Sequence, residues 1–428
     1  MGLWAKAEVT LIISLIHIHK LGKLMTAHML LLSTVLTQER LSWIEETLKS
    51  HYQEIQVTTS AKTPSDFTFF LTGDALFSLG ETESLNTWLS ILALPQITLI
   101  CDADARGIRG ISLTSLKERY PHRVHDCISD SPDDAKSFWK TLVTQSIEGP
   151  DSAHIGWLQL SSPYMFPSAG FGIQCLSAAL DLDYGITLCA SLDGCHIGHT
   201  SQNPGNTENI GAAVEKLGKQ AAEKSLPCTL LADKNSASAR GYVSWDDGLG
   251  TFGSLCMIKP FRIRNSDVIA RHIGTIPVLL SENAGNIQCS STGQTDNSPQ
   301  TNSVVILITH CPYTTEHTYG GIALAAACAH QGIPTRVVFL EEGILALTGE
   351  HRVPAGSEMY SIPELIAHLS GNENLQFSAL NTSFYMRGIL KHGTLAYVKD
   401  IDFSGLSSIL FGCPDGSGTC SHQHILFF

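Results

Sequence analysis

The sequence predicts an α/β protein made of three tandem domains, each a mainly parallel sheet with helices on both faces. Its apolar segments are unbroken runs of four to seven residues, the pattern of parallel strands buried on both faces. The segments between them are rich in Ala and Gly, which lets helices pack closely on a sheet. One strand–helix–strand pattern also recurs along the chain. The 428 residues suffice for about two to four domains.

The composition is that of a globular protein that binds proteins or small molecules. Hydrophobic residues form 43% of the chain and charged residues 16%. The formal net charge is −13 and the basic residues are scattered, whereas a nucleic-acid-binding face needs concentrated Lys and Arg. We therefore expect no direct contact with nucleic acid.

The twelve cysteines include no CxxC pair. Several lie inside apolar runs, where Cys behaves as a small buried hydrophobe: Cys175, Cys189, Cys256 and Cys328. This usage favours a reduced, cytoplasmic protein with structural thiols and one or two reactive ones.

Residues 1–26 are expected to be an N-terminal extension. The apolar run from Val9 to Ile18 is too short to span a bilayer, so no membrane partner is expected. Its length resembles the apolar part of an export signal, but no clear cleavage site follows. Alternatively, translation starts at Met25 or Met29, and whether the extension is native stays open.

The second and third domains are expected over residues 150–282 and 303–428. Leu158 to Gly194 aligns without a gap with Leu307 to Gly343, at an offset of 149. The alignment superimposes two Pro-Tyr pairs and two acidic-Gly pairs, and each copy continues to an Arg-Gly pair: Pro163-Tyr164, Pro312-Tyr313, Asp193-Gly194, Glu342-Gly343, Arg240-Gly241 and Arg387-Gly388.

A weaker copy predicts the first domain over residues 27–149. It contains FTFFLTGDAL, with Asp74, and ITLICDADARGIRG, with Arg106-Gly107. Residues 283–302 are polar and rich in Gly, Ser, Asn and Thr, which predicts a linker between the second and third domains. Cys289 lies in it and is expected to be exposed.

This pattern resembles the DsrE/DsrF/DsrH family of sulfur-trafficking proteins, which includes the TusB, TusC and TusD subunits of the tRNA-thiolation relay. The third domain is similar to DsrE/TusD through THCPYTTEHTYGG, FLEEG and MRGI. The second is similar to DsrF/TusC through SSPYMFPSAGFG, SLDG and SARGY, and the first to DsrH/TusB through FLTGDALFSL and DDAKSFWKTLV. The chain looks like these three subunits fused, in the order DsrH-like, DsrF-like, DsrE-like.

The resemblance implies a sulfur-relay protein that carries sulfur as a cysteine persulfide, a possible sulfurtransferase. It would serve tRNA 2-thiouridine synthesis or sulfur oxidation, and the sequence does not select between them. The implied partners are a small TusA-like sulfur carrier and a downstream acceptor protein. Since the family assembles as two copies of three subunits, this fusion is expected to be a homodimer. No cofactor and no metal are implied.

The family's sulfur-carrying cysteine, seven residues before the Arg of Arg-Gly, is not found here. That position holds Leu380 in the third domain, or Ser378 with a two-residue shift, and Asp233 in the second. An alternative reading is therefore a non-catalytic DsrE-fold scaffold that has lost the thiol and only binds partners.

Two other cysteines are candidate sulfur carriers. Cys311 ends a strand and precedes a helix, where a helix dipole favours thiolate, with His310 and His317 nearby. Cys101 ends the strand before Arg106, five residues ahead of it rather than seven. We rank Cys311 first, and the alternative for both is an ordinary strand-end residue.

Three further groups of residues have a functional and a structural interpretation. Cys413, Cys420, His422 and His424 could hold zinc, although their spacing is unfamiliar. The stretch from Asp193 to His199, with Cys195 and His196, could be a second thiol site but reads better as a surface turn. The acidic turn residues Asp74, Asp193 and Glu342 are each expected to cap a helix or fix a turn. The arginines of the Arg-Gly pairs, Arg106, Arg240 and Arg387, are expected to bind anions or to pack at domain junctions.

Overall fold

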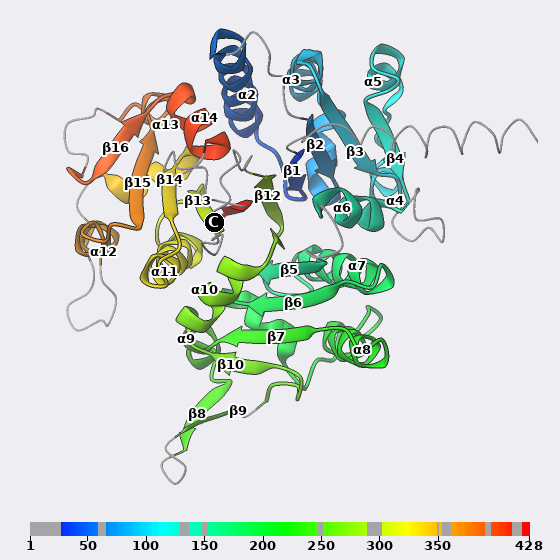
Figure 1. The fold of residues 1–428 in the computed structure, drawn as a ribbon, viewed down its shortest axis with the longest axis vertical. Helices are drawn as coiled ribbons and strands as arrows, with labels where there is room; N and C mark the ends of the chain where they lie inside the picture. Colours follow the sequence, from blue (N-terminus) through cyan, green and yellow to red (C-terminus); the bar gives the residue numbers. More distant parts are fainter. Residues whose placement is uncertain are drawn as a thin grey trace, which may run out of the picture.

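The computed structural model describes residues 27–58, 66–128, 137–147, 153–246, 251–254, 256–288, 302–348, 351–352, 361–389, 395–412 and 422–428. The extension 1–26 and Cys289 lie outside these residues. The predicted α/β class is confirmed, because nearly all strands run parallel and helices pack on the sheets (Figure 1).

The N-terminal segment has four parallel strands in the order β1-β2-β3-β4. The strands are β1 (Ala27–Leu32), β2 (Asp66–Leu71), β3 (Ile97–Asp102) and β4 (Val124–Cys127). The helices are α2 (Gln38–Thr58), α3 (Thr82–Ala93), α4 (Ala103–Ile108), α5 (Thr114–Arg119) and α6 (Phe138–Ser146), with the 3₁₀ turn η1 (Gly73–Leu79).

The middle segment has a separate five-stranded parallel sheet, ordered β10-β7-β6-β5-β11. Its strands are β5 (His154–Gln159), β6 (Gly185–Ala190), β7 (Cys228–Asp233), β10 (Arg262–Arg264) and β11 (Val278–Leu280), and β8 (Val243–Asp246) and β9 (Thr251–Ser254) form a hairpin. The helices are α7 (Ser168–Asp181), α8 (Ile210–Glu223), α9 (Lys234–Ala239) and α10 (Ser266–Thr275), with η4 (Leu192–Gly198).

The C-terminal segment has five parallel strands in the equivalent order, β16-β15-β14-β13-β17. They are β13 (Ser303–Ile308), β14 (Thr335–Phe339), β15 (Leu375–Leu380), β16 (Val398–Ile401) and β17 (His422–Phe427). The helices are α11 (His317–His330), α12 (Ile362–Leu369), α13 (Asn381–Met386) and α14 (Phe403–Phe411), with η5 (Glu341–Leu347).

Strand β12 (Asn283–Gln288) joins the N- and C-terminal segments into one ten-stranded sheet. It pairs antiparallel with β1 on one side and with β17 on the other. The prediction of a linker over residues 283–302 is therefore wrong for its first six residues, which are all buried. Their polar side chains concealed the strand, because Asn283 and Asn286 find hydrogen-bond partners inside the fold.

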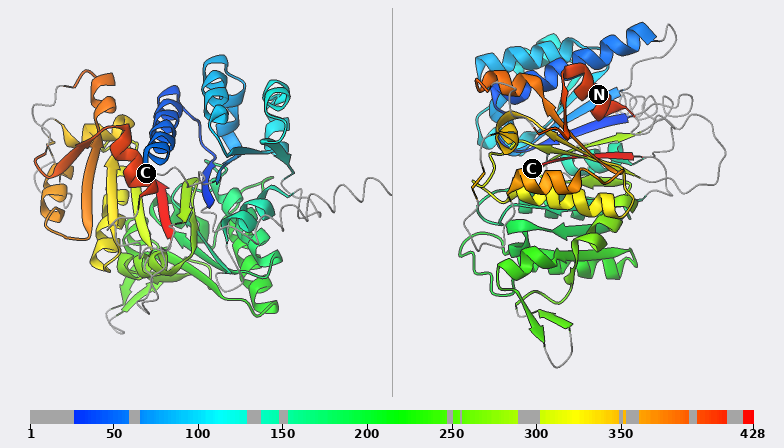
Figure 2. Two further views of the ribbon diagram at one scale, coloured as in Figure 1. Left: turned by 45° about the horizontal axis from the view of Figure 1, so that its top comes forward. Right: turned by 90° about the vertical axis from the view of Figure 1, so that its left-hand side faces the viewer.

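The ten-stranded sheet separates two hydrophobic cores. Successive side chains along each strand point to opposite faces of the sheet, so they belong alternately to one core and the other. Leu31, Ile306 and Ile308 face the core shared with the middle segment. Leu30, Leu32, Val305 and Leu307 face the core beneath α2, α3 and α14. Figure 2 shows the resulting layers, with the ten-stranded sheet between the outer helices and the middle segment.

Because β12 alone runs antiparallel, the other nine strands of the large sheet end at the same edge. The turns that follow β1 and β5 both contact Glu282, the residue that precedes β12. Ser33 donates its hydroxyl to the Glu282 carbonyl, and the Ser161 amide donates to the Glu282 carboxylate. The carboxyl ends of parallel strands are where α/β proteins place reactive groups.

In the part of the chain that the structure describes, every helix is too short or too polar to cross a bilayer.

Candidate thiol site at the carboxyl ends of the strands

Most of the described cysteines are inaccessible. Burial raises the pKa of six buried thiols, those of Cys101, Cys127, Cys175, Cys189, Cys195 and Cys328. Cys228, Cys256 and Cys311 are half-buried. The expectation of burial thus holds for Cys175, Cys189 and Cys328 but is wrong for Cys256. It lies outside the regular strands, next to a bridge between His199 and Met257.

The structure argues against Cys101 as a sulfur carrier. Its side chain is 0% exposed and packs in the core beneath α2 and α3. Burial raises its pKa, and nearby Asp126 acts in the same direction. A thiol without access cannot attack a partner's persulfide. Cys101 is therefore a structural residue of β3.

The prediction of Arg106-Gly107 as the Arg-Gly pair of the N-terminal segment is also wrong. Arg109, Arg240 and Arg387 each donate to the carbonyl four residues earlier, and each is followed by a glycine in the left-handed region. Arg106 instead pairs with Asp126. The equivalent pair is thus Arg109-Gly110, and the position seven residues earlier is Asp102, adjacent to Cys101.

The residues at this position have structural roles in the first two segments. Asp102 caps α4 by accepting from the amides of Asp104 and Ala105, and its other oxygen accepts from Thr72. Asp233 caps α9 by accepting from the amide and hydroxyl of Ser236. Capping carboxylates of this kind hold a strand–helix junction and have no nucleophilic function.

The Pro-Tyr turns connect two helices of their segments. Tyr164 and Tyr313 are both in the left-handed region, with φ of 72° and 64°. The Tyr164 hydroxyl accepts from the amide of Ile210, the first residue of α8, at 3.0 Å. The Tyr313 hydroxyl accepts from the amide of Ile362, the first residue of α12, also at 3.0 Å. Each tyrosine therefore fastens the turn after the first strand to a helix that follows the second strand.

The acidic turn residues are Asp74, Asp193 and Glu342. Each comes directly after a residue with positive φ, namely Gly73, Leu192 and Glu341. The glycines after two of them allow close approach to the first strand, because a Cβ on Gly343 would lie 2.0 Å from the Ile308 carbonyl oxygen. Asp74 pairs with Arg109 and Asp193 with Arg240, as expected for turn-fixing residues.

In the C-terminal segment, the acidic turn and the arginine of the Arg-Gly pair instead form ion pairs with the N-terminal segment. Glu341, rather than Glu342, accepts from Arg40 at 2.8 and 2.7 Å and from the Trp43 indole at 2.8 Å. Arg387 pairs with Glu39. Packing at a junction, one of the two expected roles of these arginines, is thus observed for Arg387.

Cys311 lies at the edge where nine strands end. It follows β13 by three residues, is half-buried, and is preceded by the exposed His310. The rings of His310 and His317 stack with centroids 4.8 Å apart. Burial, together with the neighbouring His310, lowers the pKa of His317 to about 4, so His317 is neutral at physiological pH. His310 is the residue directly before Cys311, and an imidazole of this kind can act as a proton acceptor for a thiol.

The middle segment contributes charged groups next to this turn. Arg240 donates to Asp193 at 2.6 Å and to Glu316 at 2.7 Å. Glu316 immediately precedes α11, and Asp193 raises the pKa of His317. The Cys311 turn therefore lies where the middle and C-terminal segments meet.

The zinc interpretation depends on Cys413 and Cys420, which lie outside the described residues. His424 is fully buried, and its Nε2 lies 3.0 Å from the Ile276 carbonyl and 3.2 Å from the Asn302 amide nitrogen. Among the described residues, no group of three or more His, Cys, Asp or Glu is arranged to hold a metal ion.

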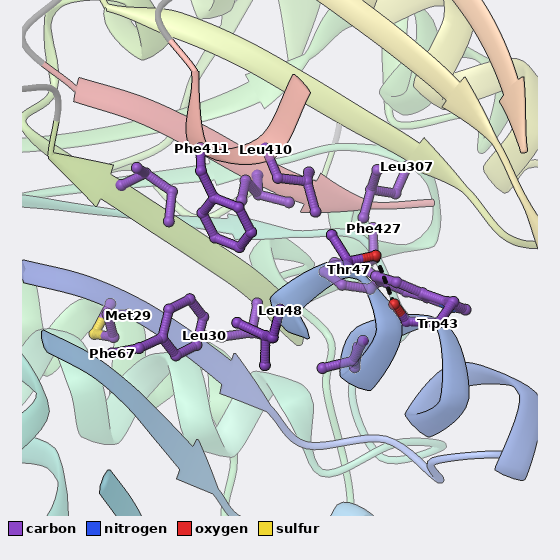
Figure 3. A pocket seen from close by; sticks show the side chains of 13 residues that line it. Met29, Leu30, Trp43, Thr47, Leu48, Phe67, Leu307, Leu410, Phe411 and Phe427 are labelled. Atoms are coloured by element: carbon purple, nitrogen blue, oxygen red, sulfur yellow. Dashed lines mark hydrogen bonds between the residues drawn. The ribbon is translucent and has the colours of Figure 1, made fainter. Parts of the chain in front are cut away.

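An apolar cavity of about 30 Å³ lies between α2, α14 and the strands β1, β12 and β17 (Figure 3). Its one polar lining residue is Thr47, whose hydroxyl donates to the Trp43 carbonyl at 2.6 Å. The cavity contains no group that could carry out thiol chemistry.

Comparison with known proteins supports a family for one part of the chain. Residues 302–410, which include Cys311, match the model of the DsrE/DsrF-like family. No curated protein matches the chain. Among solved structures, the crystal structure of the YchN protein from E. coli aligns at 18% identity and a TM-score of 0.24, covering 30% of this chain and 99% of that one.

Proposed function

We propose that the chain is a sulfur-relay protein in which Cys311 accepts sulfane sulfur and holds it as a persulfide. Its main support is that the one segment matched by the DsrE/DsrF-like family has a half-buried thiol at the carboxyl end of a strand. The free state of the described cysteines agrees with a reducing compartment, for which we propose the cytoplasm.

The proposal includes three DsrE-like domains on one chain, over residues 27–149, 150–282 and 303–428. Its support is the recurrence of three features: the left-handed residue after the second strand, a six-residue helix directly after the third strand, and the Arg-Gly pair that follows this helix. A homodimer would then replace a complex of separate subunits. A small sulfur-carrier protein would deliver the sulfur, and a protein of tRNA thiolation or of sulfur oxidation would receive it.

The proposed step is a thiol–persulfide exchange. The Cys311 thiolate attacks the outer sulfur of a donor persulfide, R–S–SH, and the donor's S–S bond breaks. Cys311 becomes a persulfide and the donor leaves as a thiolate. The exposed His310 takes the Cys311 proton and returns it to the leaving thiolate, so no external oxidant or reductant is needed.

Site-resolved mass spectrometry tests this step. The reduced protein is incubated with glutathione persulfide, alkylated and digested, and each cysteine peptide is examined for an extra sulfur atom. We expect the sulfur on Cys311 in the wild type and its loss in C311S. C228S is the matched control, because Cys228 is also half-buried but starts β7 at the opposite edge. An unloaded Cys311 contradicts the proposal.

A non-catalytic scaffold is the second candidate function. The position of the family's thiol is occupied by the capping residues Asp102 and Asp233 and by Leu380, none of which can carry sulfur. This candidate predicts that no cysteine is loaded while a partner protein still binds. Pull-down with a sulfur-carrier protein, run in parallel with the loading assay, separates the two functions.

A further inference from the structure

The Tyr313 hydroxyl has a second partner besides the Ile362 amide. His351 Nδ1 lies 2.9 Å from the Tyr313 oxygen, and the centroids of the two rings are 5.4 Å apart. His351 Nε2 lies 2.9 Å from the carbonyl oxygen of Thr348, the residue directly after η5. The Cys311 turn is therefore connected to η5 as well as to α12, through a single hydroxyl group.

These contacts define which atoms carry hydrogens. A carbonyl oxygen can only accept, so His351 Nε2, which lies beside the Thr348 carbonyl, carries the hydrogen of the neutral imidazole. His351 Nδ1 is then an acceptor, and the Tyr313 hydroxyl donates to it. The oxygen of the same hydroxyl accepts from the Ile362 amide at 3.0 Å. One neutral histidine thus orients the hydroxyl that connects the turn to α12.

The backbone of the turn depends on such contacts. Tyr313 has a φ of 64°, a left-handed conformation that residues with a side chain rarely adopt and that surrounding contacts have to maintain. Next to it, the Thr314 hydroxyl donates to the Cys311 carbonyl at 2.8 Å. Cys311 precedes Tyr313 by two residues, so the conformation of Tyr313 helps to set the position of the thiol.

The middle segment contains the same turn with a partner that does not titrate. Tyr164 has a φ of 72° and its hydroxyl accepts from the Ile210 amide, but its second partner is the Oε1 atom of Gln202. Gln202 Nε2 donates to the His196 and Ile197 carbonyls, which fixes Oε1 as the acceptor. An amide oxygen accepts throughout the physiological pH range, whereas an imidazole nitrogen stops accepting once it is protonated.

His351 is half-buried, so its imidazole can exchange protons with solvent. The titratable and charged groups on the elements around it are Glu341 and Glu342 on η5, Glu364 on α12, His310, Cys311 and Glu316 on the turn, and the adjacent Arg352. Glu341 is paired with Arg40, Glu316 with Arg240, and the Glu364 carboxylate accepts from Ser361. Among the residues that the structure describes, no carboxylate forms an ion pair with His351.

We propose that His351 is a pH-sensitive positioning residue for Cys311, which acts through the Tyr313 hydroxyl. A neutral His351 holds the hydroxyl, and the turn keeps its shape. Once His351 takes up a proton, the new hydrogen on Nδ1 faces the hydroxyl hydrogen, so Tyr313 has to turn that hydrogen away and loses its acceptor. The turn then loosens, and Cys311 accepts sulfur more slowly. This inference rests on the proposed function for its effect on sulfur transfer, but not for the change in hydrogen bonding.

Hydrogen exchange of the full chain tests the change in hydrogen bonding. It is measured at several pH values between about 8 and about 5, the range in which histidines change charge. The quantity compared is the protection factor of the Ile362 amide, which corrects its exchange rate for the effect of pH on an unstructured peptide. In the wild type we expect this factor to fall by about fivefold relative to that of Ile210, the effect of one lost hydrogen bond. Ile210 is the internal control, because its tyrosine is held by Gln202.

Two variants separate the histidine from the hydroxyl. H351Q supplies the acceptor that Gln202 supplies in the middle segment, so Ile362 should stay protected as the pH falls. Y313F removes the hydroxyl, so the protection of Ile362 should be low at every pH. A wild-type protection factor of Ile362 that changes in parallel with that of Ile210 would overturn the inference. An H351Q variant that keeps the wild-type pH dependence would overturn it as well.

Sulfur loading from glutathione persulfide then tests the consequence for Cys311. The ratio of the loading rate of Cys311 in H351Q to that in the wild type cancels the effects of pH on the donor and on the thiol itself. We expect this ratio to rise by roughly twofold or more between about pH 8 and about pH 5.5. A ratio that does not change with pH refutes the positioning role. If Cys311 stays unloaded in both proteins while Ile362 keeps its pH dependence, the proposed function fails and the change in hydrogen bonding stands.

Discussion

Arg387 and Glu39 form a two-point ion pair between residues 348 positions apart in the sequence. Arg387 Nη1 donates to Oε1 at 2.9 Å, and Nη2 donates to Oε2 at 3.0 Å. Each side chain retains 19% exposure. Together with the buried pair of Arg40 and Glu341, this contact fixes helix α2 against the C-terminal segment.

The buried pair is expected to dominate the stability of this contact. E341Q leaves Arg40 buried without its carboxylate and should lower the free energy of unfolding by about 3 kcal/mol, because an unpaired buried charge is costly. The measurement is urea unfolding followed by fluorescence. E342Q is the matched control, since Glu342 is exposed, and it should shift stability by no more than about 0.5 kcal/mol. Equal effects of the two variants would contradict the prediction.

Removing the Tyr313 hydroxyl should weaken the start of α12. Y313F keeps the ring but leaves the Ile362 amide without its acceptor, which should destabilise the protein by about 1 kcal/mol. Y164F should have a similar effect through Ile210. Hydrogen exchange can localise the change, with faster exchange expected at Ile362 in Y313F and at Ile210 in Y164F. Unchanged exchange at both amides would show that these bonds contribute little.

Acid should destabilise the protein through buried histidines. Burial lowers the pKa of His51 and of His317 to about 4, whereas an unfolded histidine titrates near 6.5. Between these values the unfolded state binds more protons, so the free energy of unfolding falls as the pH is lowered. Each histidine contributes at most about 1.4 kcal/mol per pH unit in this window.

The test compares urea unfolding of the wild type and H51Q at several pH values between about 7 and about 5. H51Q should show a smaller loss of stability with acidification, whatever its stability at neutral pH. H330Q changes an exposed histidine and should keep the wild-type slope. A wild-type slope in H51Q would mean that His51 does not titrate as described.

Thiol labelling of the native protein should separate the described cysteines by burial. Cys311 and Cys256 should react with a small maleimide, while the six buried thiols should stay protected until the protein unfolds. Peptide mapping before and after addition of urea checks this. Rapid labelling of Cys101 in the native state would contradict its assignment to the core and reopen its proposed role as a sulfur carrier.

The sequence predicted those parts of the fold that hydrophobic runs specify. Strand β13, SVVILI, is a buried and almost wholly apolar run of this kind, and the sequence predicts it. The sequence does not predict strand β12, because NAGNIQ is polar and rich in small residues, and its burial comes from β1, β17 and the two cores on either side of the sheet. A central position of this kind depends on contacts distant in sequence, which a local pattern does not contain.

The candidate site was predictable in part, for a related reason. The repeat predicts Cys311 at the end of a strand, whereas β13 ends at Ile308, three residues earlier, so Cys311 lies in the turn that follows. The charged neighbours of this turn do not follow from the sequence, since only the fold brings Arg240 of the middle segment to Glu316. The misassigned Arg106 shows the limit: ARGIRG contains two Arg-Gly pairs, and only backbone geometry identifies Arg109-Gly110 as the equivalent of the later ones.

Strand β12 also constrains how a ribosome-bound nascent chain can fold. The hydrogen bond between Ser33 and Asn283 joins residues 250 positions apart in the sequence. At common elongation rates, about 10 to 50 s of synthesis therefore separate β1 from the strand β12 that covers its open edge. The other edge of β12 pairs with β17, which leaves the exit tunnel later still, because it lies at the C-terminal end of the sequence. During translation the N-terminal segment therefore presents an unpaired apolar strand edge, the kind of surface to which chaperones bind.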